Sequence, residues 1–191
     1  MSKPDKRDEI VRAALELIAE HGFHGAPMSM IAERAGVGAG TIYRYFENKD
    51  VLIADLYREL EDKIHPYLLD GYDAQHTIRG RFVHLWTALL RYFIASPLDF
   101  RYLEQFLNSP YGAAMRREKL LGERDRRDLF CELLQDGADQ QVIKDLPFPV
   151  LAALSFGPLL YVVRDHILGF LTLDDDLIGK TIEACWDGLK R

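Results

Sequence analysis

Apolar residues recur along the chain at intervals of three and four positions, which is the spacing of one face of an α-helix. The first such stripe consists of Ile10, Ala13, Ala14, Leu17 and Ile18. Gly22 follows, and a glycine there can end the helix in a left-handed conformation. No stretch alternates apolar and polar residues for long enough to indicate a strand. The pattern therefore predicts an all-α protein.

Two short helices and one long helix are expected next. The pattern predicts helices over residues 28–35 and 41–46, joined through a tight connection at residues 37–40. Asn48 can cap the long helix, whose apolar positions recur every four residues up to Ile64. Two short helices around a glycine-containing turn, with a preceding helix able to brace them, have the anatomy of a helix-turn-helix.

The remaining sequence predicts five further helices, about nine in all. One covers residues 77–95, and Ser96-Pro97 and Ser109-Pro110 are starts for the next two, each with a capping residue followed by proline. The helix that starts at Ser109-Pro110 continues into a charged segment, which is interrupted at Gly122. The sequence then becomes apolar at residues 129–134.

The last two helices are the most apolar. A helix over residues 149–170 should bend at Gly157-Pro158, because proline removes one hydrogen bond of the ladder. The final amphipathic helix carries Leu177, Ile178, Ile182, Cys185, Trp186 and Leu189. We expect a helix-turn-helix domain over residues 1–50 and a larger helical domain over residues 51–191, connected by the helix that begins at Lys49.

The composition is that of a globular protein, with 48% hydrophobic and 28% charged residues. Cys131 and Cys185 lie within apolar helical patterns and cannot build a disulfide framework, which favours a reduced, cytoplasmic protein. No apolar segment follows the charged N-terminus, so no secretory signal is expected. Residues 146–163 are uncharged and long enough to span a membrane, but they contain three prolines. A helix packed on all sides, for example in a subunit interface, explains them better.

The net charge of −6 argues against indiscriminate binding to nucleic acid. Up to Asp50 the charges nearly balance, so any DNA contact requires a local surface. The predicted helix at residues 41–46 offers one. Ile42 and Phe46 share its inner face, and Arg44 points nearly opposite. The flanking side chains are Thr41, Tyr43 and Tyr45.

This outer face supplies hydroxyl donors for phosphates, ring edges for thymine methyl groups and a guanidinium for guanine. The small side chains of Gly38, Ala39 and Gly40 allow a close approach of the backbone to DNA. Lys49 lies in the first turn of a helix, where the helix dipole disfavours a cation unless a phosphate binds there. The alternative for the two tyrosines is plain packing, more so for Tyr45 than for Tyr43, because Tyr45 lies nearer the inner face.

From Ile31 to Leu52 the sequence reads IAERAGVGAGTIYRYFENKDVL, which resembles the signature of the tetracycline-repressor (TetR) family of bacterial regulators. The resemblance is strong over about residues 8–56, and beyond them it rests on length, helix count and the closing ACWDGLK segment. It implies DNA contacts by Ala39, Gly40, Thr41, Tyr43, Arg44, Tyr45 and Lys49. One departure is Ala26-Pro27, which replaces the family's common Ser or Thr cap, and Ser29 is a weak substitute.

The resemblance further implies a two-state switch in which a small molecule bound by the larger domain releases a dimer from DNA. The bulky rings of that domain form either an ordinary core or the wall of a ligand cavity. As candidate wall residues we predict Trp86, Phe93, Tyr102, Phe106 and Phe130, which favour a large, flat, hydrophobic or aromatic effector.

The two most apolar helices have more apolar surface than one chain can cover. We therefore predict a homodimer through a two-fold four-helix interface, and hence a near-palindromic operator. The predicted interface residues are Leu159, Val163, Ile178, Ile182 and Trp186.

Metal and catalytic chemistry find little support. The six histidines have neither ligand spacing nor a companion cluster of cysteines or carboxylates, so no metal or other cofactor is expected. No nucleophile-base pair or phosphate loop occurs, which argues against an enzyme. The remaining alternative is an all-helical small-molecule-binding protein or enzyme that does not recognise DNA.

Overall fold

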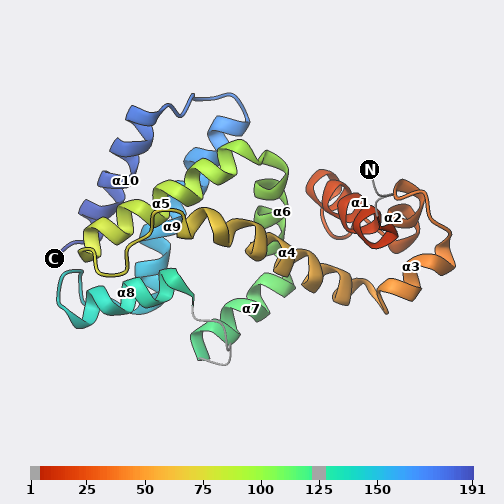
Figure 1. The fold of residues 1–191 in the computed structure, drawn as a ribbon, viewed down its shortest axis with the longest axis horizontal. Coiled ribbons are helices and arrows are strands. Elements are labelled where there is room, and N and C mark those ends of the chain that lie inside the picture. Colours follow the sequence, from red (N-terminus) through yellow and green to blue (C-terminus); the bar gives the residue numbers. More distant parts are fainter. Residues whose placement is uncertain (1–4, 122–127) are drawn as a thin grey trace. The chain divides into compact units, whose positions relative to one another are not determined.

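The computed structural model describes residues 5–121 and 128–191, and within these ranges the chain forms ten α-helices (Figure 1). They are α1 (Lys6–His21), α2 (Met28–Arg34), α3 (Ala39–Tyr45), α4 (Lys49–Leu69), α5 (Ile78–Ala95), α6 (Pro97–Leu107), α7 (Pro110–Leu121), α8 (Leu129–Asp139), α9 (Phe148–Ile167) and α10 (Asp175–Leu189). An isolated antiparallel bridge pairs Ile143 with Lys190. The prediction of an all-α protein with an N-terminal helix-turn-helix is confirmed.

The structure has one helix more than the nine predicted. The apolar segment that begins at Leu129 is a helix of its own, α8, because the Asp128 carboxylate accepts hydrogen bonds from the amides of Phe130 and Cys131 at 3.0 and 3.4 Å. These bonds satisfy amides that have no partner inside the helix, as an N-cap does. The sequence pattern merged this helix with the charged segment before it. The interruption predicted at Gly122 lies outside the described residues.

The helices group into two compact units. The first unit contains residues 1–63 and 96–123, and the second contains residues 64–95 and 124–191. The first unit thus holds α6 and α7 as well as the helix-turn-helix, while α4 contributes residues to both units. The sequence-based division at residue 50 assigns one continuous segment to each domain. Each of the two units in the structure instead combines two segments that are separate in the sequence but pack together.

In the first unit, α1 packs against α2 and α6. Its apolar stripe is buried, with Ile10, Ala14 and Ile18 fully covered. Gly22 has a positive φ of 69°, which suits glycine, and its amide donates to the Ile18 carbonyl at 2.8 Å. The predicted end of the first helix is thereby confirmed.

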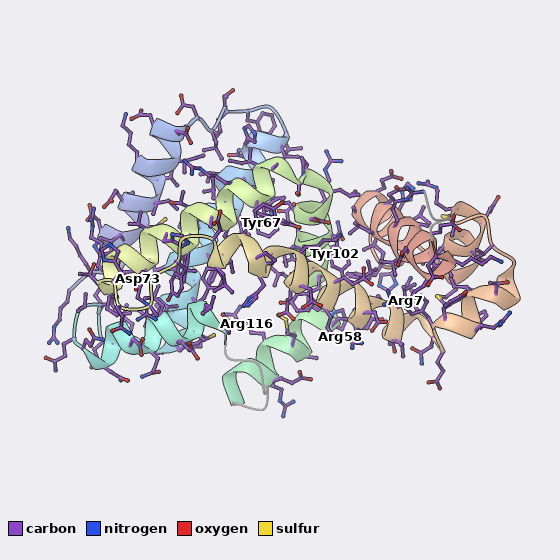
Figure 2. All side chains as sticks on the ribbon, viewed as in Figure 1. Arg7, Arg58, Tyr67, Asp73, Tyr102 and Arg116 are labelled. Atoms are coloured by element: carbon purple, nitrogen blue, oxygen red, sulfur yellow. The ribbon has the colours of Figure 1, made fainter. Side chains whose placement is uncertain are left out.

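Two tyrosines fasten α6 to α4. The Tyr102 hydroxyl, labelled in Figure 2, donates to the backbone carbonyl of Ile53 at 3.1 Å. Burial raises the pKa of Tyr102, which keeps this phenol a neutral donor. Next to it, the rings of Tyr57 and Phe106 stack with centroids 4.2 Å apart. Because aromatic pairs bury large areas, this contact gives α4 a rigid support.

In the second unit, Trp86 is the centre of the core. Its ring stacks on Phe82 at 4.3 Å and meets Phe130 and Phe156 at 4.8 and 5.0 Å. Its indole N–H donates to the Ser155 carbonyl at 2.9 Å. Ser155 lies in α9, so this hydrogen bond joins α5 to α9.

Among the described residues, α9 alone has the length and apolar composition of a helix that could cross a membrane, with a mean hydropathy of 1.3. Only 22% of that window is buried inside the chain. A helix packed on all sides within one chain would be far more buried, so much of the apolar surface of α9 remains uncovered.

Candidate nucleic-acid interface

Helix α3 has one sealed face and one open face. Ile42 and Phe46 are fully buried, and the Arg7 guanidinium covers the Phe46 ring with its carbon 5.6 Å from the ring centroid. The other side of the helix is open to solvent. It carries Ala39, Gly40, Tyr43, Arg44 and Tyr45, while Thr41 at its edge is half-buried.

The two tyrosines differ in exposure as their positions predict. Tyr43 is 56% exposed and Tyr45 is 40% exposed, so neither is a core residue. Arg44 between them is exposed as well. The sequence therefore places an arginine and two phenols on one continuous solvent-facing surface of α3.

The connection between α2 and α3 brings the backbone close to this surface. Gly36 has a φ of 65°, a conformation that favours glycine, and the Val37 amide closes the turn on the Ala32 carbonyl at 2.9 Å. A side chain at Gly40 would meet no protein atom within 4 Å. Packing therefore does not require glycine at that position.

Lys49 begins α4 and is half-buried. Its ammonium donates a hydrogen bond to the backbone carbonyl of Phe23, in the turn after α1. Desolvation lowers the pKa of Lys49, and the charge of Asp50 opposes that shift. Because an ammonium has three N–H donors, the bond to Phe23 does not exhaust it. Sequence reasoning identified Lys49 but gave no sign of this carbonyl, 26 residues away.

The starts of α4 and α2 are built differently. The predicted Asn48 cap is confirmed, because its side-chain oxygen accepts from the Val51 amide at 2.9 Å. At α2 the residue before the helix is Pro27, with no capping side chain, and Ser29 is exposed. Two amides of that first turn, those of Met30 and Ile31, bond instead to the Pro27 carbonyl at 3.0 and 3.1 Å.

Salt bridges hold the helix-turn-helix on the rest of the first unit. The Arg7 guanidinium bonds Glu59 at 2.7 Å and Asp55 at 3.0 Å, and Asp55 also pairs with Arg58 (Figure 2). The hydrogen bond to Glu59 raises the pKa of Arg7, against the effect of desolvation. Since Arg7 also covers Phe46, this one side chain links α1, the end of α3 and α4.

The predicted ligand residues fall into two groups. Trp86, Phe93 and Phe130 belong to the second unit, where Trp86 contacts Phe130. Tyr102 and Phe106 belong to the first, with ring centroids 6.1 Å apart. All but the half-buried Phe130 are buried, as both a core and a cavity wall require.

A small apolar pocket lies between α5 and α9 of the second unit. It includes Phe93 from the predicted set, and its other lining residues are Leu89, Leu90, Phe156, Leu159, Leu160 and Val163. Sequence reasoning missed these six as lining residues, because a leucine in a helical stripe looks the same whether it faces a core or a pocket.

The predicted dimer-interface residues are buried within the single chain. Leu159, Val163, Ile178, Ile182 and Trp186 are each at most 5% exposed within the single chain. They form its own core and have almost no surface left for a partner. The exposed apolar side chains of α9 and the turn after it lie instead on the opposite stripe, at Val150, Leu154, Tyr161 and Leu168. A helix that is apolar all round does not reveal from its sequence which face points inward.

The part of the chain that the structure describes contains no cluster of three or more metal-ligating side chains. Both cysteines are free thiols, and burial raises the pKa of Cys185.

Two family profiles match most of this chain. The profile of bacterial regulatory proteins of the tetR family matches residues 10–56, and that of the tetracyclin repressor-like C-terminal domain matches residues 78–190.

Individual relatives agree with these profiles. The structure of a TetR family protein from Vibrio parahaemolyticus is 32% identical, with a TM-score of 0.74 over 98% of this chain and 99% of that one. An HTH-type transcriptional regulator of Haemophilus influenzae is 23% identical over 100% of this chain and 98% of its own. A fatty acid metabolism regulator protein of Bacillus subtilis is 47% identical over 57 residues, which cover 30% of this chain and 29% of that protein. These relatives are named as regulators, not as enzymes.

Proposed function

Because this chain belongs to the tetracycline-repressor (TetR) family of bacterial transcriptional regulators, we propose that it is a homodimeric repressor that a small hydrophobic or aromatic effector releases from a palindromic operator. The observation that carries the proposal is the division of α3 into two faces. Ile42 and Phe46 are sealed inside, while Tyr43, Arg44 and Tyr45 face solvent. A protein that acts on DNA in this way works in the cytoplasm.

The open face of α3 enters the major groove. There the Arg44 guanidinium can donate two hydrogen bonds to the N7 and O6 atoms of guanine, and the tyrosine rings can contact thymine methyl groups. Thr41 at the edge of this face offers a hydroxyl to phosphate. The exposed backbone at Ala39 and Gly40 lies close to the DNA, consistent with the open space around Gly40.

Lys49 contacts a phosphate from the start of α4. Its ammonium is anchored on the Phe23 carbonyl, which limits the positions that the side chain samples. An anchored donor loses less side-chain entropy on binding than a free lysine does. The contact adds affinity for any sequence, because phosphates carry no base information.

A second copy of the chain covers the exposed stripe of α9. Val150, Leu154, Tyr161 and Leu168 are between 39% and 64% exposed and share one side of the helix and its following turn. Two such stripes related by a two-fold axis form a self-complementary interface. The axis also relates the two α3 helices, so the operator is close to palindromic.

The effector binds in the second unit, where the apolar pocket between α5 and α9 has to widen to admit it, because in this structure the pocket has room for only about one water molecule. Its lining is entirely apolar, and within the described ranges every buried side-chain nitrogen and oxygen has a hydrogen-bond partner. Such a site suits a hydrophobic or aromatic guest, because burial of a polar group without a partner is costly. The dimer has one state that binds DNA and one that does not. A ligand that binds the second state more tightly shifts the population toward it and so releases DNA.

The test is a selection of duplexes from a random pool by the purified protein. We expect recovered sequences to share a near-palindrome, and their binding to weaken as salt rises, since phosphate contacts release counterions. If no duplex is retained at low salt, DNA binding is contradicted. The all-helical small-molecule-binding protein or enzyme would then be the better interpretation.

A further inference from the structure

The start of α7 contacts the start of α4. The Tyr111 hydroxyl donates to the Asp50 carboxylate at 2.6 Å, across 61 positions of the sequence. The Tyr111 ring also packs on Phe23, with centroids 5.4 Å apart. Phe23 is the residue whose carbonyl holds the Lys49 ammonium. One aromatic side chain of α7 thus touches both supports of the first turn of α4.

We propose that Tyr111 is a positioning residue for DNA binding, which holds the Asp50 carboxylate on α7 and so leaves the Lys49 ammonium to phosphate. This rests on the proposed function, specifically on the phosphate contact at Lys49. Asp50 is exposed to solvent, and its charge interacts with that of Lys49, so its carboxylate lies where it can affect this ammonium.

The charges explain why Asp50 needs to be held. A carboxylate in the first turn favours the helix, because it faces the positive end of the helix dipole. The same charge beside a bound phosphate is unfavourable, and it competes for the neighbouring lysine. A phenol that fixes the carboxylate in one rotamer keeps the benefit to the helix and limits that competition.

The supports of this arrangement are themselves packed and hydrogen-bonded. Phe23 lies between Tyr111 and Tyr102, with the Tyr102 centroid 6.3 Å away, and the Tyr102 hydroxyl is bonded to Ile53 of α4. The hydrogen bond to Asp50 raises the pKa of Tyr111 to about 12. The phenol therefore remains a donor throughout the pH range in which the protein is handled.

A purely structural role predicts a different outcome. The bond joins a half-buried tyrosine to an exposed carboxylate, and exposed polar pairs contribute little to stability. If the bond served only the fold, its loss would barely change the melting temperature and would not change the affinity for DNA.

The experiment compares Tyr111→Phe, Asp50→Asn and the double variant in the full-length protein. The probe is a duplex that the parent protein has selected from a random pool, measured over a series of salt concentrations. We expect Tyr111→Phe to weaken binding about three- to tenfold at low salt, which corresponds to about 1 kcal/mol, with less effect at high salt. Asp50→Asn should bind at least as tightly as the parent, because one negative charge is removed.

The double variant decides the proposal. With Asn at position 50, loss of the Tyr111 hydroxyl should no longer change the affinity for DNA, because both substitutions act through the same contact. The double variant should therefore bind within about twofold of Asp50→Asn. Tyr67→Phe, at an exposed tyrosine of the second unit, should leave binding unchanged.

Two results would overturn the proposal while the proposed function stands: parental affinity and salt dependence in Tyr111→Phe, or a defect that persists in the double variant. If the parent protein binds no duplex at all, the proposed function fails first, and this inference fails with it. Thermal melting of each variant separates these outcomes from a loss of fold.

Discussion

The ammonium of Lys49 donates a hydrogen bond to the backbone carbonyl of Phe23, which ties the first turn of α4 to the turn after α1. A cation at this end of a helix opposes the helix dipole, and the carbonyl offsets part of that cost. The position of the ammonium is therefore set by the fold before any DNA arrives.

Lys49→Ala should weaken binding to all duplexes alike and reduce the salt dependence by about one ion per site, because one phosphate contact is lost. The measurement is the slope of log K against log salt for a selected and an unrelated duplex. Lys180→Ala, at a 70% exposed lysine on α10, is the matched control and should change neither. An unchanged slope in a folded Lys49→Ala protein would remove Lys49 from the interface.

The same contact predicts a pH dependence of binding. The contribution of Lys49 requires the ammonium, so it is present below the lysine pKa and is lost as pH rises through it. Desolvation lowers that pKa below its usual 10.5. In the parent protein, the dependence of DNA affinity on salt should therefore begin to weaken at a lower pH than an exposed lysine would cause. In Lys49→Ala this pH-dependent weakening should be absent.

Arg44→Ala should change sequence preference rather than general affinity. If Arg44 reads guanine, its removal should cost about 1–3 kcal/mol on the selected duplex and relax selection at one or two base pairs of each half-site. Repeating the selection with the variant measures this directly. Arg12→Ala, at a 76% exposed arginine of α1, is the control. A variant that selects the parental sequence would show that Arg44 does not read bases.

The sequence predicted α3 well because helix geometry alone decides it. Ile42 and Phe46 are four positions apart, so they share a face, and Arg44 between them must point away. A short helix with two apolar anchors has only one way to be buried. Burial of both anchors and exposure of Arg44 confirm this.

Two other features were beyond the sequence for physical reasons. Helix α9 is apolar on all sides, so periodicity could not say that Leu159 and Val163 face inward while Leu154 and Tyr161 face outward. The contact of Tyr111 with Asp50 joins residues 61 positions apart and depends on how α7 folds back within the first unit. No local pattern encodes such a pairing.

Tyr161→Glu should separate the homodimer without unfolding the chain. Tyr161 is 64% exposed in the single chain, so a charge there costs little until a second copy must cover it. We expect a monomeric mass in analytical ultracentrifugation at micromolar concentration, with unchanged helix content by circular dichroism. The matched variant is Ile182→Ala on α10, which is fully buried and should instead lower the free energy of unfolding by about 2–5 kcal/mol. A dimer that survives Tyr161→Glu would place the interface elsewhere.

Leu160→Trp should block the effector while leaving DNA binding intact. Leu160 lines the small pocket of the second unit with Leu90 and Phe93, and a larger ring fills the space that a guest needs. The probe is chosen on the parent protein, from a panel of flat aromatic and other hydrophobic compounds, as the compound that raises the melting temperature most. A ligand at about one hundred times its Kd stabilises a protein by about 2.7 kcal/mol, so the parent should show a clear shift. In Leu160→Trp that shift and the release of DNA should disappear together, because binding and release are linked.

Leu107→Trp, at a 39% exposed position of α6, adds the same ring away from the pocket and should keep both responses. An unaltered response in Leu160→Trp would mean that the effector binds outside this pocket. The rings that line it, including Phe93 and Phe156, would then be core residues only.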